Sequence, residues 1–411
     1  MPVIAVLGTM DTKADEVGYL AAEVRRLGHE PLLVDVGTGG PPGIVPAISR
    51  EELAAAAGID LVPLLARQDR GECVAAMAAA AAVLLPRLAQ EARIGGIVAL
   101  GGGGGTAIGT AAMRALPIGF PKLMISTLAT GNTAAYVGGR DIVMFPSIVD
   151  FSGLNRISRL LLSRAAGAIC GMVVGRPAAE TLDRPVIVAS MFGNTTACVG
   201  AARAILERAG YEVLVFHATG AGGRTMEGLI ESGMACGVLD VTTTEWADEL
   251  VGGILSAGST RLDAARQARV PAVIAPGCLD MVNFGEPASV PARFAGRRFY
   301  QHNPQVTLMR TTPAECAQLG RILAEKINAY RAPTTVLFPA KGLSAIGEPG
   351  QPFWDPGADA ALLAALQRDL RSDVPLVVLD VPINDPSFAK ACAETLLANM
   401  RAHGAARGTP K

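Results

Sequence analysis

Five consecutive glycines, Gly101 to Gly105, stand between an apolar run at 97–100 and a helix-like segment that begins at Thr106. A short apolar run bounded by turn residues is typical of a buried parallel strand. Glycine loses more conformational freedom on folding than any other residue, so five in a row indicate a backbone that approaches something closely. Bare N–H groups at a strand-to-helix junction bind phosphate or carboxylate. The run therefore predicts an anion-binding loop, with a flexible crossover loop as the alternative.

The glycine run is neither of the two common phosphate-binding motifs. No Gly-Lys-Ser/Thr sequence ends it, which excludes a P-loop. The dinucleotide fingerprint is satisfied trivially by any run of glycines, so a match to that pattern carries no information.

Length and composition predict two globular domains. The 411 residues are too many for one ordinary core, and half of them are hydrophobic. The 36 basic and 37 acidic residues are mixed along the chain, so no basic stripe suggests a nucleic acid partner. No uncharged apolar run reaches the roughly 18 residues of a membrane span, so no membrane association is expected.

The cysteines and the first residues predict a cytoplasmic protein. Seven scattered cysteines without a Cys-x-x-Cys pair argue against a disulfide framework and a zinc site. The apolar run at 3–7 follows no basic region and no cleavage site, so no signal peptide is expected.

The two halves of the chain follow the same order of elements. An apolar strand, a polar loop, a helix and a second strand begin at Pro2 and again at Pro185, and two further strand pairs match. This order predicts an α/β fold of two internally duplicated Rossmann-like domains, 1–178 and 179–411, each with a parallel sheet and helices on both faces. Two further strands are expected at 334–338 and 376–379, followed by a closing helix at 386–402.

Small polar residues follow nearly every predicted strand, where open parallel sheets bind ligands. We therefore expect two sites, one in each domain, or one cleft between the domains. These loops are 8–13, 35–40, 101–106 and 126–133 in the first half, and 192–196, 217–223, 242–245 and 277–285 in the second.

The first domain supplies the predicted nucleotide site. Thr12 and Lys13 are candidates for phosphate contacts, whereas Asp11 is favoured as a helix cap. Asp35 ends a strand where nucleotide folds often place an acid for the ribose, or it is simply a turn residue. The predicted nucleotide-binding residues are Thr9, Asp11, Thr12, Lys13, Asp35, Gly102, Gly103, Gly104, Gly105, Thr106, Ser126, Thr127, Thr130, Gly131, Asn132 and Thr133.

The second domain supplies the candidate catalytic residues. His217 with Glu245 or Asp280 forms a candidate acid/base pair, and His302 lies in another polar loop. Cys278 is considered as a nucleophile, but a small buried residue is the favoured interpretation. A second anion site is predicted from Asn194, Thr195, Thr196 and Arg310, and the sequence leaves any metal ligands unknown.

Six motifs in one order resemble a known family, the ATP-binding region of the tomato mosaic virus resistance protein and its bacterial and fungal relatives. The resemblance covers nearly the whole chain. The motifs are Thr9-Met10-Asp11-Thr12-Lys13, the segment 100–106, Ser126-Thr127-Leu128-Ala129-Thr130-Gly131-Asn132-Thr133, Phe145-Pro146-Ser147-Ile148-Val149-Asp150, Phe216-His217-Ala218-Thr219-Gly220 and Leu279-Asp280-Met281-Val282-Asn283-Phe284-Gly285.

The resemblance implies ATP and magnesium in the first domain, and a homodimer. In plants the similar region is followed by a barrel domain that resembles a phosphoenolpyruvate hydrolase. The resemblance therefore implies a separate barrel-domain enzyme as a partner of this chain. The chain is not expected to share the antiviral role of the plant resistance protein.

Two hypotheses about function follow. The first is an ATP-binding enzyme, or enzyme component, that acts on a small phosphorylated or carboxylated metabolite in the cleft between the domains. The second is a non-catalytic nucleotide-binding module for regulation or assembly.

Overall fold

The chain divides into two compact units, Met1–Glu180 and Thr181–Lys411, and each is described by itself. The computed structural model describes residues 2–175 and 184–406. The domain boundary predicted at 178/179 lies outside the described residues.

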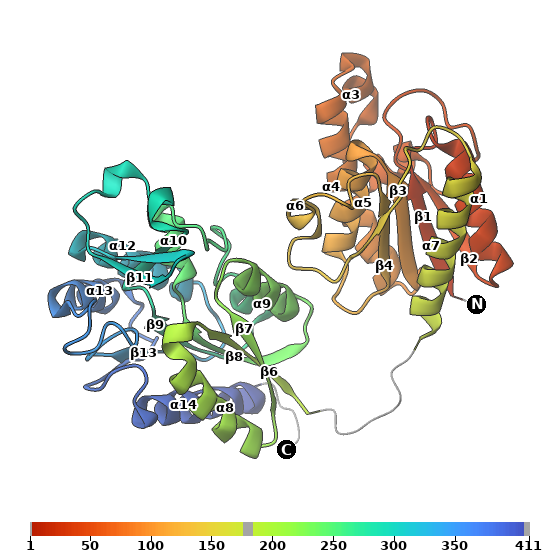
Figure 1. Ribbon diagram of the computed structural model, residues 1–411. Coiled ribbons are helices and arrows are strands. Elements are labelled where there is room, and N and C mark those ends of the chain that lie inside the picture. Colours follow the sequence, from red (N-terminus) through yellow and green to blue (C-terminus); the bar gives the residue numbers. More distant parts are fainter. Residues whose placement is uncertain (1, 176–183, 407–411) are drawn as a thin grey trace. The chain divides into compact units, whose positions relative to one another are not determined.

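Unit 1 is a parallel five-stranded sheet in the order β2-β1-β3-β4-β5. Helices cover both faces, because successive residues of a strand point to opposite sides. On β1, Ile4 and Val6 join the core under α1 and α7, whereas Ala5 and Leu7 join the core under α2, α4 and α5. Figure 1 shows α1 and α7 on one side of the unit 1 sheet and α4 and α5 on the other. The strands are β1 Val3–Gly8, β2 Glu30–Asp35, β3 Gly96–Gly101, β4 Lys122–Ser126 and β5 Val143–Pro146. The helices are α1 Ala14–Arg26, α2 Arg50–Ala56, α3 Leu61–Arg67, α4 Arg70–Gln90, α5 Gly103–Ala115, α6 Ala134–Val137 and α7 Arg156–Val174.

Two helices of unit 1, α4 and α7, are long and apolar enough by length and composition to cross a membrane. Each one packs one side against the sheet instead. Met77 and Leu88 of α4 are fully buried on one face of the sheet, and Ala165 and Ile169 of α7 are fully buried on the other. Their apolar character is therefore that of core helices in a layered domain.

Unit 2 repeats this topology. Its parallel sheet has the order β7-β6-β8-β9-β13-β14, in which the first five strands match β2-β1-β3-β4-β5. Helices α8 and α14 cover one face of the sheet, and α9 contacts β6 and β7. The strands are β6 Val186–Met191, β7 Glu212–His217, β8 Ala235–Thr242, β9 Ala272–Gly277, β13 Thr334–Pro339 and β14 Leu376–Leu379. The helices are α8 Thr196–Arg208, α9 Ala221–Glu231, α10 Glu245–Val251, α11 Ala264–Ala268, α12 Pro313–Asn328, α13 Pro356–Asp369 and α14 Pro386–Ala406.

The parallel α/β fold and the last two strands of unit 2 agree with the sequence prediction. A second, antiparallel sheet was not predicted. It consists of β10 Met281–Phe284, β12 Val306–Arg310 and β11 Phe299–Asn303, and it lies between β9 and α12 in the chain.

A buried ion-pair network joins several elements of unit 2. The Arg261 side chain is 1% exposed, and its guanidinium forms two hydrogen bonds of 2.6 and 2.7 Å to Asp240 near the carboxyl end of β8. It also donates to Glu245 at 2.7 Å and to Glu227 at 3.0 Å. Removing one partner of such a network leaves uncompensated charge in the interior.

Arg261→Met is expected to destabilise unit 2 by about 3–5 kcal/mol, because the carboxylates around it lose their counter-charge. Arg203→Met is the control, since the exposed Arg203–Glu207 pair contributes about 1 kcal/mol or less. Both tryptophans, Trp246 and Trp354, lie in unit 2, so urea unfolding followed by tryptophan fluorescence reports on this unit alone. Equal unfolding midpoints for the two variants would contradict the expectation.

Candidate functional site

A cavity of about 630 Å³ lies at the carboxyl ends of the unit 1 strands. Three segments that are distant in sequence line most of it: the β1–α1 loop, the start of α4 and the start of α5. The lining residues from these segments are Thr9, Asp11, Thr12 and Lys13, then Asp69, Arg70, Cys73 and Val74, and then Gly102, Gly104, Gly105 and Ile108.

The glycine run is mostly helix. Sequence analysis placed all five glycines in a loop, but α5 begins at Gly103 with Gly102 as its N-cap. A Cβ on Gly101 would lie 2.7 Å from the Gly105 Cα, so the first turn of α5 packs directly on the end of β3. A Cβ on Gly103 would meet nothing within 4 Å. Close packing therefore explains why residues 101 and 105 are glycines, but it does not explain the glycine at 103.

Two of the helices that begin at this cavity have no side-chain cap. Lys13 is the N-cap of α1 and Gly102 that of α5, and neither cap residue accepts a hydrogen bond through its side chain. The first N–H groups of a helix have no intrahelical partner. The start of α4 differs, since Asp69 accepts from Glu72 N–H at 2.9 Å. The uncapped ends of α1 and α5 thus supply donors for an external anion.

The contacts of Asp11 and Asp35 bear on the alternatives that the sequence left open for these two acids. Asp11 does not cap α1; its carboxylate accepts from Gly39 N–H at 2.7 Å and lines the cavity. Asp35 is 1% exposed and does not line the cavity. Its Oδ1 accepts from Met10 and Gly37 N–H groups at 3.0 and 2.8 Å. Burial raises the pKa of Asp35, and its contacts are those of a residue that holds two loops together.

Two cations line the cavity, and only one of them was predicted. Lys13 Nζ donates to the Phe151 carbonyl at 2.9 Å. Arg70 is exposed, and one of its terminal nitrogens lies 3.9 Å from the position of a Cβ on Gly104. Within the described ranges Arg70 has no hydrogen-bond or ion-pair partner, so its guanidinium is available to a ligand. Arg70 lies more than thirty residues before the glycine run, and no local motif marked it.

The predicted loop 126–133 divides between different roles. Thr106 and Ser126 are buried and share a hydrogen bond of 2.7 Å that ties α5 to β4. Ser126, Thr127 and Thr130 line a second cavity of about 310 Å³. Three predicted residues of this loop line neither cavity, namely Gly131, Asn132 and Thr133. Asn132 instead accepts from Ala134 N–H at the start of α6.

Within the described residues, no hydrogen bond or ion pair joins any two of the candidate catalytic residues of unit 2. Glu245 is buried in the Arg261 network, and Asp280 is fully buried with Ser344 Oγ at 2.6 Å from its Oδ2. His217 and His302 are exposed, His217 at the end of β7 and His302 in β11. Desolvation raises the pKa of Asp280, as it does that of the fully buried Cys278 thiol.

The predicted second anion site is also occupied by the protein itself. Arg310 is 3% exposed and donates to Asp359 at 2.6 Å and to the Phe353 carbonyl at 2.8 Å. Thr195 is fully buried against Thr242, and the Thr196 hydroxyl donates to the backbone of 192 and 193. Asn194 donates to the Met281 sulfur and accepts from Asn384 through its carbonyl.

Glu245 shows how the two units differ. Its Oε1 accepts from the N–H groups of Gly220 and Gly223, at 2.7 and 3.1 Å, at the start of α9. A Cβ on Gly223 would collide with this carboxylate. In unit 2 an internal carboxylate therefore takes the position of an anion at a helix N-terminus, whereas the starts of α1 and α5 in unit 1 are open.

No cluster of three or more His, Cys, Asp or Glu side chains suited to a metal occurs in the ranges 2–175 and 184–406. The carboxylates of the unit 1 cavity are Asp11, Asp69 and Asp150. Magnesium is commonly held by one or two carboxylates together with substrate phosphates, and this set fits that pattern.

Two family models together cover nearly the whole chain. Residues 2–178 match the N-terminal domain of the uncharacterised protein family UPF0261, and residues 184–400 match its C-terminal domain. The chain belongs to the UPF0261 family. This membership agrees with the resemblance found in the sequence.

Relatives of this UPF0261 chain occur in bacteria and plants. It is 46% identical to a UPF0261 protein of Clostridium tetani, over 97% of this chain and 98% of the relative. It is 49% identical to one from Rhizobium meliloti, over 95% and 97%. It is also 40% identical to a tomato mosaic virus susceptible protein of Solanum lycopersicum, over 96% of this chain and 55% of the plant protein. The chain thus spans about half of that plant relative.

Gly101→Ala is expected to destabilise unit 1, whereas Gly103→Ala is not. The first forces a Cβ against the Gly105 backbone and should cost about 1–3 kcal/mol. The second adds a methyl group in open space in a helical turn, so the free energy of unfolding should stay within about 1 kcal/mol or rise. Amide hydrogen exchange of β1 and β3 measures the free energy of unfolding of unit 1 in both variants. Equal destabilisation would contradict the packing of α5 on β3.

Asp248 is expected to make unit 2 less stable as the pH rises. Its carboxylate is buried against the Asn283 amide, at 2.6 Å, and burial raises its pKa to about 7. In the unfolded chain the pKa is about 4, so between about pH 4 and 7 the folded state holds the extra proton and stability falls with rising pH.

Asp248→Asn should remove this part of the pH dependence. The test is the difference in urea midpoint between variant and wild type from pH 4.5 to 7.5, read by tryptophan fluorescence. Asp359, whose pKa is also raised to about 7, contributes the same trend to both proteins and cancels. A difference that does not change with pH would contradict the expectation.

Proposed function

We propose that unit 1 binds ATP, with the phosphates at the uncapped starts of α1 and α5. The observation that carries the proposal is the convergence of these two helix ends and the unpartnered Arg70 on one cavity. Helix N-termini favour negative charge through oriented N–H groups, and arginine binds phosphate oxygens in pairs.

The cavity also suits the rest of a nucleotide. Its volume of about 630 Å³ lies in the usual range for small-molecule sites, about 300–1,000 Å³. Leu65, Val74 and Ile108 form an apolar part that a base would contact. These side chains come from α3, α4 and α5, so α4 and α5 would contact both the base and the phosphates.

Three carboxylates in the lining oppose the binding of a bare triphosphate. Asp11 and Asp69 each use one oxygen for a backbone N–H, from Gly39 and Glu72. The remaining oxygens are suited to a magnesium ion that arrives with the phosphates. Such an ion would neutralise phosphate charge beside these aspartates, so we propose the magnesium complex as the bound form.

We propose an enzyme, or enzyme component, as the role of this UPF0261 chain, with a second small molecule as substrate. The alternative is a non-catalytic regulatory or assembly module, which binds ATP equally well but does not turn it over. A homodimer, a barrel-domain enzyme partner, a cytoplasmic location and a site between the two units stay predictions.

Calorimetric titration of the full chain with ATP, ADP and AMP, with and without magnesium, tests the proposal. We expect ATP with magnesium to bind most tightly, and absence of binding by all three nucleotides would overturn the proposal. Phosphate release under the same conditions separates the enzyme from the regulatory module.

Arg70→Ala is expected to weaken ATP binding about tenfold or more, since a hydrogen bond to a charged group contributes about 1.5–3 kcal/mol. Adenosine affinity should not change, because adenosine has no phosphate. Arg67→Ala is the matched control: Arg67 pairs with Glu72 on the surface and does not line the cavity. Equal ATP affinities of the two variants would contradict a phosphate contact at Arg70.

A further inference from the structure

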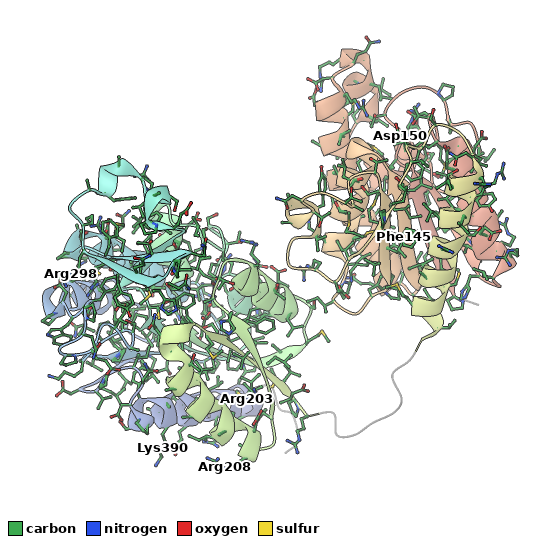
Figure 2. The ribbon with its side chains drawn as sticks, viewed as in Figure 1. Phe145, Asp150, Arg203, Arg208, Arg298 and Lys390 are labelled. Atoms are coloured by element: carbon green, nitrogen blue, oxygen red, sulfur yellow. The ribbon has the colours of Figure 1, made fainter. Side chains whose placement is uncertain are left out.

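The second cavity of unit 1 is next to the first. Asp150 lines both, and Figure 2 shows this residue at the edge of the unit 1 sheet. The cavities also meet near α5, where the Thr127 hydroxyl lies 3.8 Å from the position of a Cβ on Gly102. A molecule in the second cavity would therefore lie beside the phosphates of a nucleotide in the first.

The walls of the second cavity combine hydroxyl groups with aliphatic carbon. Its hydroxyls come from β4, from the loop after it and from the loop after β5, and its aliphatic side chains come from the segment 146–149. The lining residues are Ser126, Thr127, Thr130, Pro146, Ser147, Ile148, Val149 and Asp150.

Some of these polar groups already have partners. Ser126 bonds Thr106, and Ser147 Oγ donates to the Val149 carbonyl at 2.7 Å. In the part of the chain that the structure describes, the hydroxyls of Thr127 and Thr130 have no side-chain hydrogen bond. Asp150 Oδ1 accepts from Phe151 N–H at 2.8 Å, which leaves Oδ2 for a ligand. Two hydroxyls and one carboxylate oxygen thus face the cavity unpaired.

The charge of the lining indicates which ligands fit. Among the described residues no lysine, arginine or histidine lines this cavity, and Asp150 is its one charged side chain. An anionic ligand would meet a carboxylate and no counter-charge. A neutral ligand with several hydroxyls can donate to Asp150 and to the threonine hydroxyls, which both donate and accept.

Ile148, which lines the second cavity, has an unusual backbone conformation. Its φ is +63°, a left-handed conformation that β-branched residues rarely adopt, and the residue is 69% exposed. Strained backbone of this kind tends to occur at binding sites. The strain presents an aliphatic side chain at the cavity, where it would contact the C–H face of a polyhydroxylated molecule.

We propose that this cavity is a subsite for a second ligand, a small uncharged polyhydroxylated molecule held beside the phosphates of the nucleotide. The proposal rests on the proposed function for the identity of its neighbour. It replaces the phosphorylated or carboxylated metabolite expected from the sequence with a neutral one. Its volume of about 310 Å³ limits the ligand to a small molecule.

The test uses the full chain and two matched sets of probes: the polyols glycerol, erythritol and xylitol, and the acids glycerate and threonate. Binding is measured by saturation-transfer NMR, first without nucleotide and then with a non-hydrolysable ATP analogue. We expect at least one polyol to bind and the acids to bind more weakly. Binding of none of the polyols, or tighter binding of the acids, overturns the proposal.

Thr130→Val and Thr133→Val form the matched pair of variants. Thr130 lines the second cavity, whereas Thr133 lies in the same loop, lines neither cavity and makes no side-chain cap. Losing one hydrogen bond should weaken polyol binding about three- to tenfold in Thr130→Val and leave it unchanged in Thr133→Val. Equal polyol affinities of the two variants would overturn the placement.

The nucleotide measurements separate the two proposals. If the wild-type chain binds a polyol but no ATP, the proposed function is wrong and the subsite proposal stands. If the wild-type chain binds ATP but none of the polyols, the subsite proposal is wrong and the proposed function stands.

Discussion

The close contact between the end of β3 and the first turn of α5 is the constraint on which the site of unit 1 depends. A side chain at 101 would collide with the Gly105 backbone, so only glycine allows the helix to begin directly above its strand. This packing brings the open N–H groups of α5 beside the β1–α1 loop. Without it the donors would have no common cavity with Lys13 and Arg70.

The two units share a topology but differ in how the polar groups at the carboxyl edge of the sheet are used. Five strands have the same order in both sheets, and small polar loops follow them at the carboxyl edge. In unit 2 those loops are closed by the protein's own charges: Glu245 accepts from the start of α9, and Arg310 pairs with Asp359. In unit 1 the starts of α1 and α5 have no side-chain cap and line a cavity. Closed networks of this kind stabilise a fold, whereas open donors leave a place for a ligand.

The fold was largely predictable because its signals are local. Apolar runs, glycine boundaries and the repeat of elements indicated two parallel α/β domains and the final strands of unit 2. The antiparallel sheet escaped prediction, since β10, β11 and β12 are short and pair only after 281 and 310 have been brought together. The start of α5 was misplaced because propensity disfavours glycine in a helix, and tertiary packing overrides it.

The site was predictable only in part. Most of the predicted residues in the segments 9–13 and 102–105 line one cavity, because residues after parallel strands meet at one edge, but Gly103 does not line it. Arg70 could not be found, since it begins a helix between β2 and β3 and no motif connects it to the glycines. Asp35 and Glu245 look like ligand-binding acids in sequence; burial and backbone donors, which depend on distant segments, assign them to the framework.

The sequence by itself determined the layers, the succession of strands and helices along the chain and the edge of each sheet that carries polar loops, because periodicity and turn residues act over a few positions. The tertiary structure alone decided which polar groups are buried with partners and which remain open. That difference arises from contacts between segments far apart in the chain, as between Arg261 and Asp240 or Arg70 and Gly104. Such contacts leave no pattern in a single sequence.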